Sequence, residues 1–467
     1  YYAPFHIAEN NVAKKIVELS RVDFDELEID IEKEIQKIEE KNDITFGRKQ
    51  KIAIRESIEN GIMIITGGPG TGKTTIINAI INICEDLVMK VVLAAPTGRA
   101  ATRMTETTGR ESKTIHRLLE YSFMENEDMA FNKNEESPLE ADIVIIDEAS
   151  MIDILLMNSM LKAINPGTRL ILVGDVDQLP SVGAGNVLKD IINSGTIKVV
   201  MLDEIFRQAE ESMIIVNAHK INKGEKPLLN EKDKDFYFMS VKSPQEIVNI
   251  IIDLIKERLP NFYGIDSIKD IQVLTPMKKG EVGIFSLNKH IQNALNPKSK
   301  EKQEKQIGDD IFRVGDKVMQ IKNNYSLEWE IVREGNVIDT GEGVFNGDFG
   351  YIIDIDNEDG IIKVLFDDER CVEYDFKQID ELKLAYATTV HKAQGSEFPV
   401  VIMPIYSGPP MLLTRNLLYT AITRAKQLVV LVGEEKYMYM MIKNNIITKR
   451  YSSLDKKTKN YLNTFFR

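Results

Sequence analysis

The sequence predicts an α/β protein built on parallel β-sheets, with a small all-β segment inserted in its C-terminal half. From Thr45 onward, short apolar runs alternate with helical stretches, and this alternation is typical of a parallel sheet. Residues 307–384 instead hold closely spaced short apolar runs, separated by Gly- and Asp-rich turns that favour a small β-barrel. The α/β pattern resumes after residue 384, so the barrel is predicted to be inserted into a second α/β domain.

Local patterns predict the individual elements in order. Residues 1–45 have apolar residues at helical spacing and no residue type that stands out for catalysis, so they are predicted to be a helical remnant of a longer N-terminal region. Four apolar runs of the first α/β region are predicted to be buried strands: Ile62–Thr66, Lys90–Ala94, Ile143–Ile146 and Leu170–Val173. The predicted barrel strands are Val318–Ile321, Phe349–Ile355, Ile361–Phe366 and Cys371–Tyr374, and the last two predicted strands are Val400–Ile405 and Leu428–Val432.

Composition limits the classes of protein to which the chain can belong. Its 467 residues are too many for one ordinary core, and no apolar run approaches the roughly 18 residues that span a bilayer. The chain begins without Met and without a secretory leader, so we expect a fragment. Cys84 and Cys371 are its only cysteines, which argues against a disulfide framework and favours a reducing cytoplasm.

A net charge of −13 is unfavourable for binding to nucleic acid when the chain is taken as a whole. Residues 1–45 hold twelve acidic and six basic side chains, so nearly half of the excess lies there. Because binding depends on local basic grooves, the net charge does not exclude a nucleic-acid partner.

A glycine-rich segment indicates a nucleotide site. Gly67-Gly68-Pro69-Gly70-Thr71-Gly72-Lys73-Thr74 fits GxxxxGK[ST] between a predicted strand and the helical stretch Ile76–Ile83. Glycines let backbone N–H groups close around phosphates, and Lys73 is expected to reach the β- and γ-phosphates while Thr74 holds Mg²⁺. The predicted loop residues that bind the nucleotide are Gly68, Pro69, Gly70, Thr71, Gly72, Lys73, Thr74 and Thr75.

Two polar segments follow later predicted strands. Asp147 is expected to bind the magnesium ion, and Glu148 to accept a proton from the attacking water. Gln178 is expected to hydrogen-bond the γ-phosphate or that water, although a polar turn before Pro180 is the alternative.

Two arginines lie far along the chain from the glycine-rich segment. A second domain that offered Arg207 and Arg424 across a cleft would stabilise charge on the transferring phosphoryl group. Closure of the cleft would then depend on the γ-phosphate, which is how hydrolysis becomes movement. Taken alone, either arginine is more often part of a surface salt bridge.

Seven segments stand in order over about residues 46–433. They are the glycine-rich segment, Ala95-Pro96-Thr97-Gly98-Arg99-Ala100-Ala101, Thr114-Ile115-His116-Arg117-Leu118, Asp147-Glu148-Ala149-Ser150, residues 174–180, residues 388–397 and residues 419–425. With this set the chain resembles a superfamily 1 helicase, and within it the RecD-like type of the 1B group.

The resemblance implies a fold and a division into domains. It implies two RecA-like parallel-sheet motor domains, a short β-hairpin insertion that parts the duplex and an accessory barrel that grips the strand. The implied domains are residues 46–200 with the hairpin at about 120–138, residues 201–306 together with 385–467, and the barrel at 307–384. An ordinary surface loop is the alternative for the hairpin.

The resemblance also implies roles for single residues. Gln50 would read adenine, Glu397 would contact the nucleotide sugar or its hydration, and Gln178 would sense the γ-phosphate. Arg207 and Arg424 would complete the site from the second motor domain. The residues implied to line the strand-binding channel are Pro96, Thr97, Arg99, Thr114, His116, Thr389, His391 and Gln394. Its histidines could stack on bases, although a histidine alone is more often structural.

The predicted function is hydrolysis of ATP with Mg²⁺, coupled to translocation on single-stranded DNA and to separation of duplex junctions in recombination or repair. The direction, 5′ to 3′, comes from the resemblance alone. The motor is expected to act as a monomer with no membrane partner. An RNA-directed helicase and an ATP-gated single-strand clamp or loader that does not unwind are the alternatives.

Overall fold

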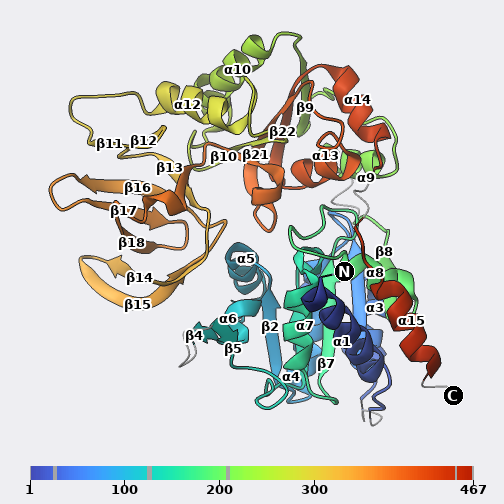
Figure 1. Ribbon diagram of the computed structural model, residues 1–467. Coiled ribbons are helices and arrows are strands. Elements are labelled where there is room, and N and C mark those ends of the chain that lie inside the picture. The colour runs from blue at the N-terminus through green and yellow to red at the C-terminus, as the bar shows by residue number, and fades with distance from the viewer. Residues whose placement is uncertain (1, 25–28, 124–128, 207–210, 447–449, 465–467) are drawn as a thin grey trace. The chain divides into compact units, whose positions relative to one another are not determined.

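The computed structural model divides into two compact units (Figure 1). The first comprises Tyr1–Glu211 together with Thr448–Arg467, and the second comprises Ser212–Ile447. The residues that the structure describes are 2–24, 29–123, 129–206, 211–446 and 450–464. Within these ranges, no helix has the length and apolar character needed to cross a membrane.

The first unit is built on a six-stranded parallel sheet of order β3-β2-β6-β7-β1-β8, with a separate antiparallel hairpin of β4 and β5. Its strands are β1 (Ile62–Gly67), β2 (Val91–Ala95), β3 (Ser112–Thr114), β4 (Tyr121–Phe123), β5 (Met129–Phe131), β6 (Ile143–Ile146), β7 (Arg169–Gly174) and β8 (Lys198–Leu202). Its helices are α1 (Ala3–Leu19), α2 (Ile31–Asn42), α3 (Arg48–Glu59), α4 (Lys73–Asp86), α5 (Gly98–Thr108), α6 (Ile115–Leu118), η1 (Ala149–Met151), α7 (Ile154–Lys162), α8 (Val187–Ser194) and α15 (Leu454–Thr464).

The second unit contains a five-stranded parallel sheet of order β20-β10-β21-β22-β9. Its strands are β9 (Phe236–Ser240), β10 (Ile271–Thr275), β20 (Ala387–Thr389), β21 (Phe398–Ile405) and β22 (Ala425–Gly433). The helices of this unit are α9 (Met213–Asn222), α10 (Pro244–Asp253), η3 (Leu254–Arg258), α11 (Leu259–Tyr263), α12 (Ile284–Leu295), η4 (Ile379–Glu381), η5 (Val390–Ala393), α13 (Arg415–Ile422) and α14 (Glu435–Lys443).

The two parallel sheets share one strand order. Taken in chain order, the strands β1, β2, β3, β6 and β7 of the first sheet are arranged third-second-fourth-fifth-first, and the five strands of the second sheet repeat that arrangement. The strand β8 adds a sixth position beside β1. Parallel strands place all their carboxyl ends at one edge, where the loops that bind ligands gather.

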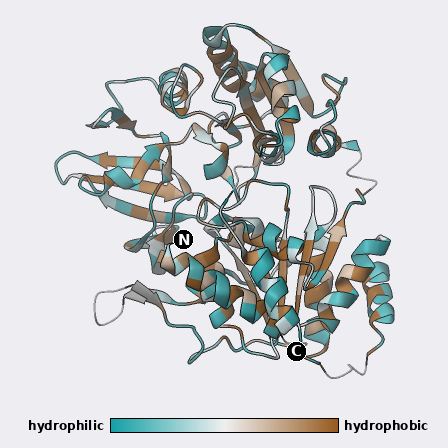
Figure 2. Ribbon diagram, turned by 45° about the vertical axis from the view of Figure 1, so that its right-hand side comes forward, coloured by the Kyte–Doolittle hydropathy of each residue, from teal (hydrophilic) through white to brown (hydrophobic). Residues whose placement is uncertain are grey.

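Alternate residues of the first sheet's strands enter two different cores. Ile62 and Ile64 pack with residues of α1 and α7, whereas Met63 and Ile65 pack with residues of α3 and α4. All four side chains are at most 1% exposed, so both faces of the sheet are covered. Figure 2 shows the resulting hydrophobic strands and the mixed outer helices.

The N-terminal and C-terminal helices are parts of the first unit. Residues 1–45 contain the helices α1 and α2, which pack into the two cores of this unit. The helix α15 lies beside α1 (Figure 1), although the sequence pattern grouped residues 385–467 with the second domain. Helical periodicity shows that a helix has a buried face, but it does not show which sheet that face covers.

An antiparallel sheet of seven strands is inserted between α12 and β20, within the predicted range 307–384. Its order is β15-β14-β18-β17-β16-β13-β19, with β11 and β12 forming a separate pair. These strands are β11 (Glu304–Ile307), β12 (Asp310–Arg313), β13 (Lys317–Gln320), β14 (Asn324–Arg333), β15 (Asn336–Val344), β16 (Phe349–Asp356), β17 (Ile361–Phe366), β18 (Arg370–Asp375) and β19 (Leu382–Leu384). The antiparallel character of the insertion is thus observed, and its description as a barrel stays a prediction.

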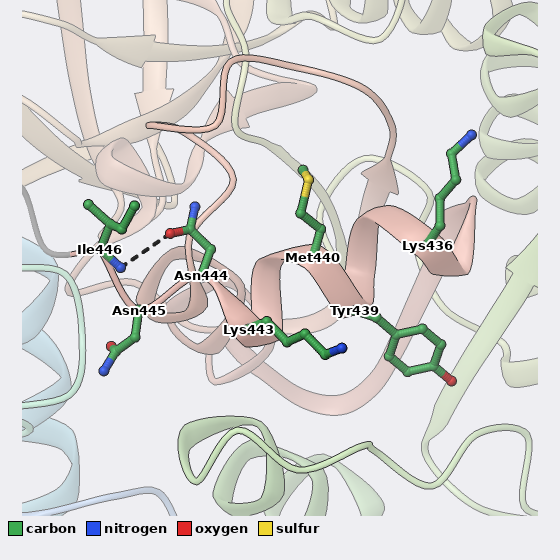
Figure 3. Close-up of a pocket in the computed structure, with 7 residues that line it drawn as sticks. All are labelled: Lys436, Tyr439, Met440, Lys443, Asn444, Asn445 and Ile446. Carbon is green, nitrogen blue, oxygen red and sulfur yellow. Dashed lines mark hydrogen bonds between the residues drawn. The ribbon is translucent and has the colours of Figure 1, made fainter.

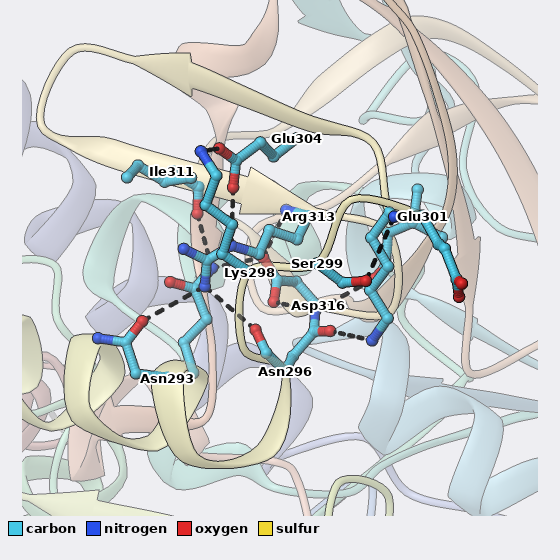
Figure 4. Close-up of polar contacts among 12 residues, drawn as sticks. Asn293, Asn296, Lys298, Ser299, Glu301, Glu304, Ile311, Arg313 and Asp316 are labelled. Atoms are coloured by element: carbon cyan, nitrogen blue, oxygen red, sulfur yellow. Dashed lines mark hydrogen bonds and ion pairs between the residues drawn. The ribbon is translucent and has the colours of Figure 1, made fainter.

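A buried polar network joins this sheet to α12 (Figure 4). The Asp316 carboxylate accepts hydrogen bonds from Gln292 Nε2 at 2.6 Å, Asn296 Nδ2 at 2.7 Å, Arg313 N at 2.7 Å and the Tyr386 hydroxyl at 2.9 Å. Burial raises the pKa of Asp316, while these donors favour its ionised form. The network therefore holds both the chain that enters the inserted sheet and the chain that leaves it.

Candidate active site

Three of the predicted segments meet at the carboxyl ends of the neighbouring strands β6, β7 and β1. The pairs Ile146↔Leu172 and Thr66↔Gly174 bring the three strand ends to the same edge. The approach at Gly174 is close, because a Cβ there would lie 3.1 Å from Ala149 N. The glycine-rich loop, Asp147-Glu148 and Gln178 are therefore gathered at one edge of one sheet.

The loop that follows β1 requires glycine at two positions. Gly70 and Gly72 have φ values of 73° and 80°, in the left-handed region that other residues rarely adopt. A Cβ at Gly72 would also lie only 2.2 Å from the ring of Phe206. The Phe206 backbone N–H donates to Gly70 O at 3.1 Å, so the chain beyond β8 supports the loop.

The N-terminus of α4 faces into this loop. The helix starts after Gly72 without a side-chain cap, whereas Thr97 and Asp153 cap the starts of α5 and α7. The first N–H groups of a helix have no partner within the helix, so those of Lys73, Thr74 and Thr75 suit an anionic ligand.

The Lys73 side chain lies over the glycine-rich loop. Its Nζ donates to Gly67 O at 2.7 Å and to Gly68 O at 2.9 Å. The Thr71 hydroxyl donates to Gly68 O at 2.9 Å and closes the loop further. Phosphate oxygens would be stronger acceptors for Lys73 than these carbonyls, because they carry charge.

Gln50 connects α3 to the same loop. The side chain is 5% exposed, its Oε1 accepts from Gly47 N at 2.8 Å, and its Nε2 donates to Thr71 O at 2.8 Å. A glutamine amide has two N–H groups and two oxygen lone pairs, so these bonds use one of the N–H groups and one of the lone pairs. The amide has the chemistry that adenine recognition requires, and that role stays a prediction.

Asp147 and Glu148 follow β6 in a strained turn. Glu148 has a φ of 51°, and its N–H donates to Asp147 Oδ1 at 2.8 Å. Burial, helped by the Glu148 charge, raises the pKa of Asp147. On the other side, Arg103 of α5 lies 3.9 Å from the Glu148 carboxylate. Strain of this kind is concentrated at functional sites.

Gln178 lies in a buried turn after β7. Its Nε2 donates to the Asp175 carboxylate at 3.3 Å, and the same carboxylate accepts from Asp177 N at 3.0 Å. The Val176 N–H donates to the Thr66 hydroxyl at 3.2 Å, so the turn is attached to β1 as well as to β7. The side chain of Gln178 is 8% exposed and held in a defined position.

This donor set fits ATP and Mg²⁺. Magnesium is usually held by one or two carboxylates and by substrate phosphates, so Asp147 with the Thr74 hydroxyl is a sufficient protein contribution. Within the described part of the chain, no cluster of three or more His, Cys, Asp or Glu side chains is placed to hold a metal by itself.

Some residues of the first unit that were predicted to contact DNA are used in structural hydrogen bonds, and others are partly exposed. The Thr97 and Thr114 hydroxyls accept from Ala100 N at 3.3 Å and from Arg117 N at 3.2 Å, and so cap their own helices. Pro96 and Arg99 lie half-buried beside Thr97 where β2 passes into α5.

His116 packs at the base of the hairpin. Its ring centroid lies 5.7 Å from those of Tyr121 and Phe131, which pair across β4 and β5. Burial lowers the pKa of His116, so the ring is neutral at pH 7. The hairpin predicted at about 120–138 is present in these two strands, and its tip lies outside the described residues.

The corresponding segment of the second unit follows β20. The Thr389 hydroxyl accepts from Lys392 N at 3.3 Å, and His391 is exposed. Gln394, by contrast, is 5% exposed. The segment thus has the same threonine-capped turn as the segment at Thr114, but its histidine is exposed.

Arg424 and Glu397 are neighbours in the second unit. Arg424 is 2% exposed, its Nη1 donates to Ser396 O at 3.4 Å, and its carbonyl accepts from Phe398 N at 2.8 Å. Glu397 lies 3.6 Å from Lys426. Arg207, the other predicted arginine, lies outside the described residues.

Sequence reasoning missed several residues beside these segments. Arg103 stands one helical turn after Arg99, and this spacing on one helix face was the available signal. Lys392 lies beside Lys278, whose charge adds to burial in lowering the Lys392 pKa, and its Nζ donates to Asn346 Oδ1. Lys278 is the second residue after Pro276, which follows β10 as Pro96 follows β2, so the repeated strand order could have drawn attention to this segment.

A hollow on the surface of the second unit contains none of the predicted site residues. It lies along α14 and is lined by Lys436, Tyr439, Met440, Lys443 and residues 444–446 (Figure 3).

Family models match three parts of the chain. An AAA domain model matches residues 50–184, the SH3 domain of ATP-dependent RecD-like DNA helicases matches residues 287–366, and the C-terminal domain of UvrD-like helicases matches residues 384–432. The second match begins in α12 and covers part of the inserted antiparallel sheet.

Curated relatives carry related descriptions. An ATP-dependent RecD2 DNA helicase of Deinococcus radiodurans is 37% identical over 366 residues, which are 78% of this chain and 46% of that protein. The RecBCD enzyme subunit RecD of Buchnera aphidicola subsp. Schizaphis graminum is 29% identical, over 85% of this chain and 74% of that protein. The chain spans about half the length of the first of these relatives.

Among solved structures, a Pif1 helicase from Bacteroides in complex with ADP-AlF3 and ssDNA is similar with a TM-score of 0.49 and 20% identity. The similarity covers 87% of this chain and 95% of that one, and it is too distant to assign residues.

Proposed function

We propose that this chain is a RecD-like superfamily 1 helicase, which hydrolyses ATP with Mg²⁺ to move along single-stranded DNA and separate duplex DNA. The polarity included in the proposal is 5′ to 3′. The description of the Deinococcus radiodurans relative as a DNA helicase supports DNA as the substrate.

The observation that supports hydrolysis most directly is the gathering of three strand ends in the first unit. The glycine-rich loop, the Asp147-Glu148 turn and the Gln178 turn come from β1, β6 and β7, which are adjacent. A phosphate-binding loop alone would suit many classes of nucleotide-binding protein. A carboxylate pair and a buried amide beside it supply the groups that activate and detect a water molecule.

Each residue would perform a separate task. Lys73 and the first turn of α4 would bind the β- and γ-phosphates, and Asp147 with the Thr74 hydroxyl would hold Mg²⁺, which neutralises phosphate charge when bound. Glu148 would accept a proton from water, with Arg103 keeping its carboxylate in place. Gln178 would hydrogen-bond the γ-phosphate.

The second unit would supply Arg424 and Glu397 to the nucleotide and part of the strand-binding channel. The exposed His391 ring and the nearby Lys278 and Lys392 side chains have the chemistry that holds bases and phosphates without reading sequence. We extend the channel to Lys278 on this basis, and Arg207 keeps its predicted role at the nucleotide.

Unwinding of duplexes with a single-stranded tail tests the proposal. With ATP and Mg²⁺, we expect separation of a 5′-tailed duplex and little separation of a 3′-tailed one, with Lys73→Ala inactive on both. Equal ATPase rates with and without DNA would reject a DNA motor. Stimulation by a matched RNA oligonucleotide alone would replace DNA by RNA as the substrate, and stimulation by DNA without any strand separation would favour a clamp or loader.

A further inference from the structure

Arg450 binds three carbonyl oxygens of one short loop. In the first unit, its Nη1 donates to Gly183 O at 2.7 Å and Gly185 O at 2.5 Å, and its Nη2 donates to Ser181 O at 2.6 Å. The distance from Nη1 to the Ser181 hydroxyl is 3.4 Å. Charge-assisted bonds from one guanidinium to several carbonyls fix a loop far better than neutral contacts do.

The loop is shaped to present these carbonyls. A Cβ at Gly183 would lie 2.1 Å from the Asp153 carboxylate, and Gly185 has a φ of 90°. The Ile154 N–H donates to Ala184 O at 3.0 Å, so the start of α7 supports the loop from one side. Burial lowers the pKa of Arg450, and the charges of Asp153 and Asp190 oppose that shift.

The loop continues directly from the turn that carries Gln178. Only Leu179 and Pro180 separate Gln178 from Ser181, and both Leu179 and Ser181 are buried, at 5% and 3% exposure. The near end of this segment is fixed by the Asp175 carboxylate. Arg450 therefore fixes the far end of the segment that positions Gln178.

The chain reaches Arg450 from the second unit. The helix α14 ends at Lys443, and Arg450 stands only a few residues further along, before α15. Past Arg450, Lys457 of α15 pairs with the buried Glu9 carboxylate at 2.9 Å, which anchors this helix in the first unit. A force transmitted along the chain from the second unit would therefore act on Arg450 before it acted on α15.

We propose that Arg450 is a positioning residue for Gln178 and that it transmits the state of the second unit to the nucleotide site. Binding of single-stranded DNA by the second unit changes the tension on the chain at Arg450, and the bound loop passes that change to the Gln178 turn. The inference rests on the proposed function, because it takes Gln178 as the residue that contacts the γ-phosphate.

The test compares ATPase rates with and without single-stranded DNA. For Arg450→Ala, we expect the DNA-stimulated kcat to fall roughly tenfold to a hundredfold, as expected when a catalytic group loses its position. The unstimulated rate should fall by a smaller factor than the stimulated one, and the KM for ATP should stay close to wild type. Arg450→Lys should recover part of the stimulation, because an ammonium cannot bind all three carbonyls at once. Added guanidinium ion should partly restore Arg450→Ala.

Lys457→Ala is the matched control. It removes the ion pair that anchors the same helix but leaves the loop at residues 181–185 intact, so DNA stimulation should persist. A short Gly/Ser insertion after Ile446 keeps Arg450 and relaxes the connection, and it should reduce stimulation as Arg450→Ala does.

Each outcome has a distinct meaning. Without DNA stimulation of the wild type, the proposed function fails and this inference fails with it. If the wild type is stimulated and Arg450→Ala or the insertion variant equals it, only the inference is overturned. Equal loss in Arg450→Ala and Lys457→Ala would also overturn it, since docking of α15 would explain both. If Arg450→Ala does not fold, the same readings apply to Arg450→Lys and the insertion variant.

Discussion

The two parallel sheets have the same strand order but different chemistry at their first strands. In the first unit, β1 passes into a loop with two left-handed glycines and then into α4, whose first residue is Lys73. In the second unit, β9 is followed by Val241-Lys242-Ser243, and α10 starts at Pro244. Strand order therefore fixes where a binding edge can form, and the residues after one strand decide whether that edge can hold phosphate.

The third strands of the two sheets differ in a subtler way. Both β3 and β20 are edge strands that end in threonine, followed by an apolar residue, a histidine and a basic residue. Both threonines, Thr114 and Thr389, cap the turn that follows. His116 is nevertheless packed against aromatic rings of the hairpin, while His391 is exposed. The repeated motif gives both segments the same capped turn. The chain that follows each motif determines whether its histidine is covered or can reach a ligand.

The largest expected effect concerns the difference between the segments that follow the first strands, β1 and β9. Lys73→Ala should lower kcat for ATP by roughly 10²–10³ or more, because it removes a charge aimed at the transferred phosphate. Lys242→Ala, in the loop that follows β9, should leave the ATPase within about twofold of wild type, since an exposed substitution there removes no phosphate contact. Steady-state ATPase assays measure both, and equal losses would show that the second sheet's edge also serves the nucleotide.

Arg424→Ala tests whether the second unit acts on the nucleotide of the first. We expect roughly a 10²-fold loss of kcat with ATP affinity retained, because charge on the transferring group is no longer stabilised. Nucleotide-binding assays measure the affinity for ATP, and single-turnover hydrolysis measures the rate of the chemical step.

Arg424 is almost fully buried, so a melting curve must accompany that variant. Lys426→Ala, an exposed change two residues away, is the control. Turnover at the wild-type rate in Arg424→Ala would remove its predicted role.

The two histidines should separate DNA binding from stability. His391→Ala should weaken single-stranded DNA by about fivefold or more, as expected for loss of about 1 kcal/mol of base stacking, with an unchanged Tm. His116→Ala should lower the free energy of unfolding by about 1–2 kcal/mol through lost aromatic packing and change DNA affinity less. Fluorescence anisotropy and thermal melting measure these quantities. The opposite result would mean that exposure does not identify the DNA-facing histidine.

The smallest expected effect is a pH dependence confined to the first unit. Burial raises the pKa of Asp147 to about 6, and Mg²⁺ requires the ionised carboxylate. The ATPase should therefore fall as the pH decreases toward and below about 6, while DNA affinity does not decrease. Since the proton and Mg²⁺ compete for the Asp147 carboxylate, a higher Mg²⁺ concentration should shift this decrease of the ATPase rate to lower pH. A decrease that does not shift with the Mg²⁺ concentration would assign the titration to another group.

Sequence patterns predicted the parts of this fold that depend on continuous apolar runs. The strands at Ile143–Ile146 and Ile361–Phe366 were predicted with their observed bounds. The long hairpin of β14 and β15 was missed, because its residues are mostly exposed and polar. Strand pairing through the backbone leaves no apolar signature in such a segment.

The candidate site was predictable where its residues lie close together in the sequence. The contacts of Lys73 and the turn of Glu148 arise within a few residues of each other, so motifs describe them. Arg450 belongs to no motif, since its three carbonyl partners precede it by more than 260 residues. No local pattern can anticipate a partner of that kind.

The attachment of α15 to α1 has a consequence for synthesis of the chain on the ribosome. Glu9 is 3% exposed, and the partners of its carboxylate are Ser452, Ser453 and Lys457, which lie more than 440 residues further along the chain. Nascent domains commonly fold in the order in which they emerge. Here α1 leaves the ribosome long before the residues that bind its buried Glu9 carboxylate, so this contact of the first unit can form only after the second unit has been translated.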